Sequence, residues 1–559
     1  MTYELIDKLQ SGGVRWAIRN DAVMPLSSQH NYKRTCLMAA VETGLRVVGA
    51  TNTGSGFDDV LAIERTLTPQ VVIALCGPLG TPLHEVAQSF KDLLLSTDYG
   101  YEYVEIIRLS EEIRNKVGLG ANSSIKDLIE AGNDLRREHG NEVLAKLAVR
   151  RISIARAAEQ AKATAAKKAE HPDLFNDEGD DGLVPNVTLK WCHIIDSVKH
   201  VDELRLLRSI YGEMLYVVGV YSPIEMRIAR LEGALKNEKI HELIDRDSGE
   251  EIDHGQRVED TFPQSDFFLR VEKTTDSHRL SRVKRFLDLM LGTVIATPTV
   301  NERAMYAAFS AARNSACLSR QVGAAITSEG GELISTGWND VPKAFGGLYQ
   351  TEGDGLNSDE DRRCWNMGGG LCSNDQEKKA ISNYIVDKLV ESEIISPDKK
   401  EAALSVIRGK TQLKSLIEFS RAVHAEMHAL LNAGAADGAK IRHGKLFVTT
   451  YPCHSCARHL VAAGIKEVIF LEPYRKSLAT RLHQDAITEN ESDTTKVRVL
   501  PFDGVAPSRF LKFFSANPAG RKKDGRMILR DAEPVARISM EAVSTLEGLV
   551  VKGLESRRL

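Results

Sequence analysis

The sequence predicts an α/β protein built from two successive α/β domains. Strand-like runs alternate with helical segments from Val71 to about residue 290, and a second series of strands and helices follows. This alternation is typical of mainly parallel sheets that helices cover on both faces. We therefore expect domains at residues 66–290 and 291–559, the second with an insertion at 342–420. Residues 1–65 form an N-terminal segment to which the sequence assigns no role.

The bulk composition restricts the classes of function. The chain has 559 residues, of which 42% are hydrophobic and 27% charged, as in ordinary soluble proteins. A formal net charge of −4 gives no general attraction to nucleic acids or membranes. The eight scattered cysteines suit a reducing cytoplasm better than a disulfide framework. Residues 1–19 lack the apolar core of a signal peptide and no run has transmembrane length, so we expect a cytoplasmic protein without a membrane partner.

The first domain begins with a strand at Val71–Cys76 and a helix at Leu83–Leu95, joined by a glycine-bearing turn. Helical segments separate three further strand-like runs: Tyr103–Arg108, Trp191–Asp196 and Met214–Val220. The segment Arg150–Glu170 is rich in Ala, Lys and Arg and predicts a helix. It contains no aromatic residues that would stack on bases, so we interpret it as a solvated helix and not as a nucleic-acid surface.

The turn after the first strand contains Gly77, Gly80 and Thr81. Backbone N–H groups at such a turn, together with the helix dipole, can hold a phosphate. The turn resembles the phosphate-binding turn of P-loop kinases, although no Lys follows Gly80 as the kinase motif requires. Residues 194–200 and 226–262 resemble the core and lid of nucleoside-monophosphate kinases. The resemblance implies a P-loop kinase-like three-layer α/β domain.

The missing lysine leaves the charge of a transferring phosphoryl group without its usual neutralisation. We therefore interpret the first domain as a degenerate kinase fold. It would bind a nucleotide or another regulator at Gly77, Gly80 and Thr81 without phosphorylating it. A purely architectural domain is the alternative, and the sequence does not separate the two.

The second domain begins with a helix at Glu302–Ala316 and strands at Val322–Thr327 and Glu332–Thr336. After the insertion, an Ala- and Leu-rich run that starts near His424 predicts another helix. A strand at Lys445–Thr450 follows, and a further helix begins a few residues after it.

Four residues of this domain have the types and spacing of a zinc site with a proton carrier: His424, Glu426, Cys453 and Cys456. One imidazole and two thiolates are zinc ligands, and they leave the fourth tetrahedral position to water. The cysteines lie in a first helical turn, whose dipole favours their thiolate forms. Glu426 lies beside the metal without ligating it, where a proton carrier is needed. This H-x-E…P-C-x-x-C pattern is the signature of zinc-dependent nucleobase deaminases.

A closed structural site is the alternative for these ligands. His428 follows His424 by four residues on the same helical face, and it could complete a Cys2His2 set without a catalytic opening. The position of Glu426 and the proline before the cysteine pair favour the catalytic zinc site.

Segments on either side of the insertion resemble the deoxycytidylate deaminase family. They are, in order, Gln321–Ile326, Ser335–Asp340, His424–Glu426 and Tyr451–Cys456. The resemblance implies a cytidine-deaminase-like α/β/α domain with Zn²⁺ as its cofactor. It also implies a base pocket lined by Val322, Gly323 and Ala324. Asn339 would contact the nucleoside; the alternative is that it only stabilises the turn at residues 337–340. Trp338 occupies the position at which the family has Tyr.

The whole arrangement is similar to the bacterial anti-phage dCTP deaminases, which join a lysine-less kinase-like domain to such a deaminase. This resemblance implies hydrolysis of dCTP to dUTP and ammonia in antiviral defence. It also implies a homo-oligomer that a regulatory nucleotide or a phage-derived trigger controls. The alternatives are a dCMP deaminase of nucleotide metabolism, a nucleic-acid-editing deaminase and a non-catalytic zinc module. The acidic balance and the 6% aromatic content argue against a nucleic-acid partner.

Several other residues have two interpretations. Arg320, Arg475 and Lys476 are either contacts for substrate phosphates, because cations suit phosphate oxygens, or solvated surface charges. Cys364 and Cys372 flank a glycine-rich turn in the insertion. Some deoxycytidylate deaminases carry a second, structural zinc near this region, and ordinary buried thiols are the alternative.

Overall fold

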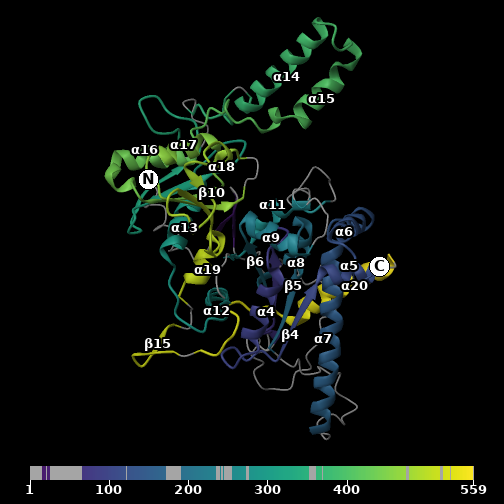
Figure 1. The fold of residues 1–559 in the computed structure, drawn as a ribbon. Helices are drawn as coiled ribbons and strands as arrows, with labels where there is room; N and C mark the ends of the chain where they lie inside the picture. The colour runs from purple at the N-terminus through teal and green to yellow at the C-terminus, as the bar shows by residue number, and fades with distance from the viewer. Residues whose placement is uncertain are drawn as a thin grey trace. The chain divides into compact units, whose positions relative to one another are not determined.

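The computed structural model describes residues 16–19, 22–25, 66–120, 122–170, 190–234, 240, 243–244, 255–271, 276–351, 361–367, 369–473, 477–516, 520–528 and 530–557. The chain divides into two compact units, residues 1–62 and 63–559. In the smaller unit the described backbone forms an antiparallel hairpin of β1 (Trp16–Arg19) and β2 (Ala22–Pro25). The rest of the predicted segment 1–65 lies outside the described residues. The larger unit contains two six-stranded sheets (Figure 1).

The first sheet is mainly parallel. It consists of β3 (Val71–Cys76), β4 (Tyr103–Arg108), β5 (Trp191–Asp196), β6 (Leu215–Tyr221), β7 (Phe267–Arg270) and β14 (Gly504–Val505). The strand order is β14-β7-β6-β3-β5-β4, and β14 alone runs antiparallel to its neighbour. Every residue of β3 and β5 is buried, as in parallel strands that are covered on both faces.

Helices cover both faces of the first sheet. They are α4 (Leu83–Leu94), α5 (Leu109–Val117), α6 (Ile125–His139), α7 (Val143–Glu170), α8 (Val201–Tyr211), α9 (Ile224–Ala234), α11 (Val258–Thr261), α12 (Asp276–Leu291) and α20 (Met540–Ser556). Side chains of β3 alternate between the faces. Ile73 belongs to the core with α4 and α12, and Ala74 to the core with α7, α8 and α20. The predicted α/β class is confirmed, and the likeness to a P-loop kinase stays a prediction.

Helix α20 packs on the first sheet, although the sequence predicts its residues to belong to the second domain. Met540 and Val543 join the core that α7 and α8 form on that sheet. The buried carboxylate of Glu547 accepts hydrogen bonds from Arg156 of α7 and Tyr211 of α8. In Figure 1 the yellow α20 lies beside the blue α7. The first sheet is therefore completed by residues from the far end of the sequence.

The second sheet has a mixed topology. Its strands are β8 (Gly323–Thr327), β9 (Leu333–Trp338), β10 (Lys445–Thr450), β11 (Glu467–Glu472), β12 (Ile487–Thr488) and β13 (Val497–Pro501). The order is β12-β13-β11-β10-β8-β9, in which β8 runs antiparallel to both neighbours and the others pair in parallel. The helices that pack on it are α13 (Val300–Ala312), α16 (Ala425–Asp437), α17 (His454–Ala462) and α18 (Ala479–Leu482).

Two glycines allow helices to approach the second sheet closely from opposite faces. A Cβ atom on Gly323 of β8 would lie 2.0 Å from the carbonyl oxygen of Ala308 in α13. A Cβ atom on Gly337 of β9 would lie 2.3 Å from the backbone nitrogen of Ala429 in α16. Helix α13 therefore covers one face and α16 the other, which gives the expected α/β/α layers.

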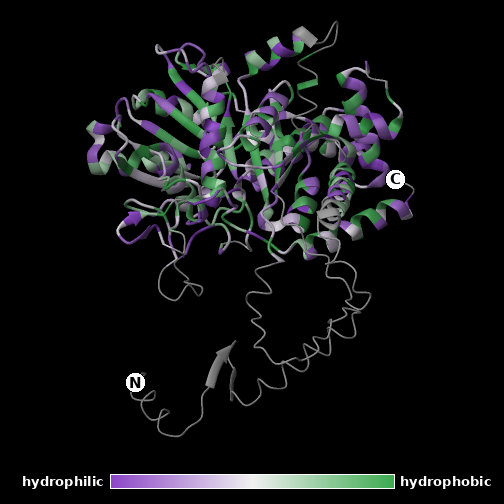
Figure 2. Ribbon diagram, turned by 90° about the horizontal axis from the view of Figure 1, so that it is seen from below, coloured by the Kyte–Doolittle hydropathy of each residue, from purple (hydrophilic) through white to green (hydrophobic). Residues whose placement is uncertain are grey.

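Helix α13 also connects the two sheets. The strands of both sheets are largely hydrophobic and appear mainly green in Figure 2. Met305 of α13 lies in one buried cluster with Phe268 of β7 and Phe447 of β10. Glu302 of the same helix is buried, and its carboxylate accepts a hydrogen bond from the N–H of Val505 in β14 at 3.0 Å. The two sheets thus share a core within residues 63–559.

The insertion contains a helical hairpin, α14 (Ser373–Glu391) and α15 (Lys400–Lys410), whose helices run side by side in Figure 1. The 3-10 turn η6 (Gln412–Ser415) leads back toward α16. The remaining elements are η3 (Gly212–Met214), η4 (Phe262–Gln264), η5 (Pro397–Lys399), η7 (Gly438–Ile441), η8 (Pro507–Arg509), α19 (Phe510–Phe514), β15 (Lys522–Lys523) and β16 (Arg526–Met527). Among the helices described, none has the length and apolar character needed to cross a membrane.

Candidate active site

The three predicted metal ligands converge at the start of two helices. His424 is the N-cap residue of α16, Cys453 is the N-cap residue of α17, and Cys456 follows in the first turn of α17. The Nδ1 atom of His424 lies 3.4 Å from the Sγ of Cys453 and 3.3 Å from the Sγ of Cys456. The three ligand atoms all lie within 4.8 Å of one another. Within the described part of the chain, they form the only such cluster of three or more His, Cys, Asp or Glu residues.

The geometry of this cluster fits a zinc ion. Tetrahedral bonds of about 2.0 Å to nitrogen and 2.3 Å to sulfur separate the two ligand atoms by roughly 3.5 Å. The observed separations of 3.3 and 3.4 Å agree with that value. Hydrogen bonds from Cys456 and His424 lower the pKa of the Cys453 thiol, which favours the thiolate that a metal requires. The site therefore uses Zn²⁺ as its cofactor, as predicted.

Glu426 lies in the first turn of α16, one residue beyond the start of the helix. Its side chain is buried, and it lines the same cavity as His424 and Cys453. Burial raises the pKa of Glu426, and the nearby Cys453 thiolate raises it further. A carboxyl group whose pKa is raised holds a proton more readily than an ordinary glutamate does, which suits general acid–base catalysis.

His428 does not complete the metal site. Its Nδ1 accepts a hydrogen bond from the backbone N–H of Trp338 at 3.2 Å, and its ring packs edge-on against the Trp338 ring at 4.7 Å. Its Nε2 lies 3.2 Å from the side-chain nitrogen of Asn432. Both ring nitrogens therefore contact β9 or α16 and not the cysteines, and the closed Cys2His2 alternative is wrong.

The metal ligands open into a cavity of about 340 Å³. Of the predicted base-pocket residues, Val322 lines this cavity, and Gly323 and Ala324 do not. Gly323 lies against the backbone of α13, and Ala324 packs in the core beneath α16, because successive residues of β8 point to opposite faces of the sheet. Both residues therefore support the packing of the two helices that flank the strand.

Asn339 lines the cavity and also holds the neighbouring residues of its wall by hydrogen bonds. Its side-chain nitrogen donates to the carbonyl oxygen of Arg320 at 2.9 Å, and its side-chain oxygen accepts from the N–H of Val322 at 2.7 Å. Half of its hydrogen-bonding capacity is therefore used to hold residues 320–322, and one amide N–H and one lone pair of the oxygen are left for a ligand. Arg320 also lines the cavity, whereas Arg475 and Lys476 lie outside the described residues.

The insertion contributes a wall that the sequence does not reveal. Residues from the first turns of α14 and from the segment at η6 line the cavity together with Glu426: Asn374, Asp375, Lys378, Lys414, Ser415, Leu416 and Ile417. A lysine-bearing segment just before the metal helix is the available sequence signal. The spacing of the lysines along the chain does not predict which residues face the metal. Only the folded helical hairpin brings the start of α14 and the segment at η6 together at the cavity.

Cys364 and Cys372 form no metal site with the residues described. The Sγ of Cys372 lies 3.6 Å from the hydroxyl of Ser319, and the Sγ of Cys364 lies 4.0 Å from the hydroxyl of Ser373. Neither cysteine joins a group of three ligands in the described ranges. Cys364 and Cys372 line a small cavity of about 20 Å³. Cys317, for which the sequence predicts no role, lines it as well.

The turn after β3 closes on itself. The N–H of Thr81 donates to the carbonyl oxygen of Pro78 at 3.1 Å, and Gly80 has a φ of +84°, as expected for a type II β-turn. A Cβ atom on Gly80 would lie 2.8 Å from the carbonyl oxygen of Arg227 in α9, and one on Gly77 would lie 2.5 Å from that of Val220 in β6. These glycines therefore permit close packing, while Thr81 lines a cavity of about 430 Å³ together with His84, Asp196 and Lys199.

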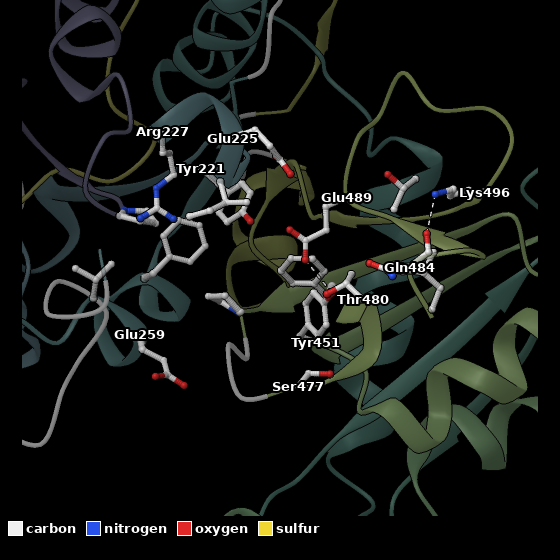
Figure 3. A pocket seen from close by; sticks show the side chains of 18 residues that line it. Tyr221, Glu225, Arg227, Glu259, Tyr451, Ser477, Thr480, Gln484, Glu489 and Lys496 are labelled. Carbon is white, nitrogen blue, oxygen red and sulfur yellow. Dashed lines mark hydrogen bonds between the residues drawn. The ribbon is translucent and has the colours of Figure 1, made fainter. Parts of the chain in front are cut away.

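A further cavity, of about 600 Å³, is lined by residues from around both sheets (Figure 3). Tyr221 at the end of β6 and Glu225 and Arg227 of α9 line one side of it. Tyr451, just after β10, and Glu489, just after β12, line the other side. The hydroxyl of Tyr451 donates to the carboxylate of Glu489 at 2.9 Å. Tyr451 also lines the catalytic cavity, so one side chain belongs to both walls.

Known proteins and a protein-family model match this part of the chain. The family model described as "Cytidine and deoxycytidylate deaminase zinc-binding region" matches residues 298–472. The deoxycytidylate deaminase of Enterobacteria phage T2 is 28% identical over 177 residues, which cover 30% of this chain and 78% of the phage protein. ComE operon protein 2 of Bacillus subtilis is 40% identical over 60 residues, 10% of this chain and 29% of that protein.

Solved structures also match. The dCMP deaminase of cyanophage S-TIM5, in complex with dCMP and dUMP, is 19% identical to this chain. The match covers 37% of this chain and 99% of the cyanophage protein, with a TM-score of 0.22. From the family and relatives above, residues 298–472 form a cytidine and deoxycytidylate deaminase domain with a zinc-binding region. The chain is thus an enzyme of the hydrolases that act on C–N bonds of cyclic amidines.

Proposed function

We propose that the enzyme deaminates a free deoxycytidine nucleotide, with dCTP as substrate and dUTP and ammonia as products. One observation carries this proposal. The buried Glu426 and the ligands His424 and Cys453 lie in the same cavity as the cations Arg320, Lys378 and Lys414. A cavity of about 340 Å³ has room for a single nucleotide.

The roles of the residues follow from their positions. When bound by His424, Cys453 and Cys456, zinc supplies a Lewis acid that makes water nucleophilic at neutral pH. Glu426 takes the proton from the attacking water and delivers it to N3 of cytosine as C4 is attacked. The same carboxylate then takes the proton of the new C4 hydroxyl group and passes it to the amine, which leaves as ammonia while C4 becomes a carbonyl carbon. Asn339, just after β9, and Val322, just before β8, lie side by side and orient the nucleoside together.

A polymeric substrate has less support. Single-stranded nucleic acids are bound by basic grooves and by aromatic side chains on which bases stack. The lining of the catalytic cavity includes one aromatic residue, Tyr451. The formal net charge of the chain is −4. We therefore favour deamination of a free nucleotide over deamination of a nucleic acid. Among mononucleotides, dCMP is the alternative substrate to dCTP.

The biological role that we propose is depletion of dCTP in anti-phage defence. An active dCTP deaminase would also drain the pool of the host, so its activity must be restrained until infection. The first sheet is the natural place for such control, because Tyr451 lines both the catalytic cavity and the cavity shared with that sheet. A phage-derived trigger or a regulatory nucleotide would act there. Full activity of the purified protein without any effector would contradict this role.

We also propose that the first sheet binds a nucleotide without transferring phosphate. Thr81, Asp196 and Lys199 line a cavity of about 430 Å³ at the carboxyl ends of β3 and β5. No lysine follows Gly80, and the N–H of Thr81 is used within the turn. Incubation with ATP and each nucleoside monophosphate should give no phosphotransfer. Turnover would overturn this proposal, and failure of ATP to bind would favour a purely architectural role.

The substrate is tested by measuring ammonia release from dCTP, dCMP, cytidine and single-stranded DNA. We expect the highest kcat/KM with dCTP and no release from any substrate with Glu426→Ala. Zinc analysis of that variant checks that the metal is retained. Deamination of DNA with no deamination of a mononucleotide would refute the proposal.

A further inference from the structure

The insertion places a helix N-terminus at the catalytic cavity. Helix α14 is 19 residues long, and its early residues Asn374, Asp375 and Lys378 line the cavity. Its N-cap residue, Cys372, makes no side-chain capping hydrogen bond. The N–H groups of the first turn and the helix dipole together favour a negatively charged group at this position.

Asn374 provides an independent sign that a ligand binds beside this turn. Its side chain is 8% exposed, and its nitrogen donates to the carbonyl oxygen of Leu416 at 2.9 Å. That bond fixes the orientation of the amide, because a carbonyl oxygen accepts only from the nitrogen. The side-chain oxygen of Asn374 is buried and has no hydrogen-bond partner among the described residues. A buried acceptor without a partner is costly, so the site is built for a donor such as a sugar hydroxyl.

The charges around the turn favour an anion. Lys378 and Lys414 line the cavity on the insertion side, and Arg320 lines it from the loop before β8. The ammonium of Lys378 lies 3.3 Å from the carbonyl oxygen of Lys414 and 3.1 Å from the carboxylate of Asp375. Asp375 is the opposing charge, but its side chain is 69% exposed, and such exposed ion pairs are weak. A phosphate can therefore compete for Lys378.

We propose that the first turns of α14, with Lys378 and Lys414, form a polyphosphate subsite of the catalytic cavity. In this arrangement the deaminase scaffold holds the base, the buried side-chain oxygen of Asn374 accepts from a sugar hydroxyl, and the two lysines of the insertion hold the terminal phosphates. The insertion thereby sets the preference for a triphosphate over a monophosphate. This inference rests on the proposed deamination of a free deoxycytidine nucleotide.

The test compares kcat/KM for dCTP, dCMP and deoxycytidine in the wild type and in the double variant Lys378→Gln/Lys414→Gln. Loss of each charge-assisted contact should lower kcat/KM for dCTP at least about tenfold. The loss should be smaller for dCMP and smallest for deoxycytidine, which has no phosphate. The matched control is Lys379→Gln/Lys410→Gln, because both lysines are exposed on the same helical hairpin and line no described cavity wall. The control should keep the wild-type ratio of dCTP to dCMP.

A single change of opposite sign sharpens the test. Asp375→Asn removes the opposing charge and should raise kcat/KM for dCTP by about twofold to fivefold, with a smaller gain for deoxycytidine. An equal loss with all three substrates in the double variant would overturn the inference, and so would no loss at all. Thermal melting of each variant separates these outcomes from misfolding.

Failure of the proposed function is distinguishable from failure of this subsite. If the wild type deaminates no cytosine compound, the proposed function fails, and binding of inorganic tripolyphosphate by calorimetry decides the subsite alone. Binding that the double variant weakens at least about fivefold supports the subsite. Absent binding, or equal binding by both proteins, overturns it.

Discussion

Two junctions in this molecule share a local architecture and differ in chemistry. In one, β3 leads through a short turn into α4; in the other, β10 leads through Tyr451–Cys453 into α17. Both therefore place a helix N-terminus at the carboxyl end of a parallel strand, where ligands commonly bind in α/β proteins. Yet one junction closes into a β-turn packed against α9, and the other holds two metal ligands.

The difference lies in the capping residue and in the element that faces it. At the first junction the N-cap residue is Pro82, which makes no capping bond, and the backbone of Arg227 fills the space above Gly80. At the second, the N-cap sulfur of Cys453 accepts a hydrogen bond from the N–H of Cys456, and His424 of α16 faces both sulfurs. A helix dipole alone thus does not define a site; the side chains around it do.

The largest effect is expected from a substitution that removes a metal ligand at the second junction. His424→Ala removes one of the three ligands, and the deaminase should lose its zinc and more than about a thousandfold of its activity. Metal analysis and ammonia release measure the two losses. His459→Ala on α17 is the control, because its Nδ1 contacts the carbonyl oxygen of Ser455 at 2.6 Å and not the metal cluster. Retention of zinc and activity in His424→Ala would contradict the site.

The next effect separates metal binding from proton transfer. Glu426→Gln keeps the shape of the side chain but cannot carry the proton, so activity should fall about 10²- to 10⁴-fold. Zinc content should stay at the wild-type level, because Glu426 is not one of the clustered ligands. Loss of zinc in this variant would show that the carboxylate holds the metal instead.

The third effect tests the first junction as packing. Gly80→Ala adds a Cβ at a φ of +84° and 2.8 Å from the carbonyl oxygen of Arg227, so the free energy of unfolding should fall by about 1–3 kcal/mol. Gly118→Ala is the matched control: its φ is +70°, but nothing lies within 4 Å, so only about 1 kcal/mol should be lost. Chemical denaturation measures both. An equal loss in the two variants would mean that the contact with Arg227 does not matter.

The smallest effect concerns the tyrosine that belongs to two cavities. Tyr451→Phe removes the hydrogen bond to Glu489 and should lower the free energy of unfolding by about 1 kcal/mol. Tyr384→Phe serves as the control, because Tyr384 is 65% exposed and its loss should stay within about 0.5 kcal/mol. Equal urea denaturation midpoints for the two variants would show that the hydrogen bond between Tyr451 and Glu489 does not stabilise the wall that the two cavities share.

The sequence predicts those parts of the molecule in which local pattern and tertiary environment agree. The buried runs of β3, β5 and β10 are continuous and largely apolar, so their strands lie within a residue of the expected positions. The metal cluster is predicted because His424, Cys453 and Cys456 are residue types that bind zinc, and the spacing of the two cysteines places them in one helical turn. Gly323 and Gly337 read as ordinary turn or strand residues, since the helices that need their missing side chains are distant in sequence.

Long-range contacts account for what the sequence does not show. The cavity wall from α14 and η6 depends on how the insertion folds back, which no local periodicity records. The same holds for α20, whose apolar residues Met540 and Val543 could in principle cover either sheet. A hydrophobic stripe predicts that a helix will be buried, but it does not identify the surface that buries it.

The return of the chain to the first sheet has a consequence for anyone who wishes to transplant the deaminase into another protein. The second sheet is formed by residues that lie between β7 and β14, so it is inserted into the first sheet and does not simply follow it. A single cut near residue 295 would leave α20 on the wrong fragment and expose the core around Glu547. A functional graft would need two junctions, one near residue 295 and one near residue 503.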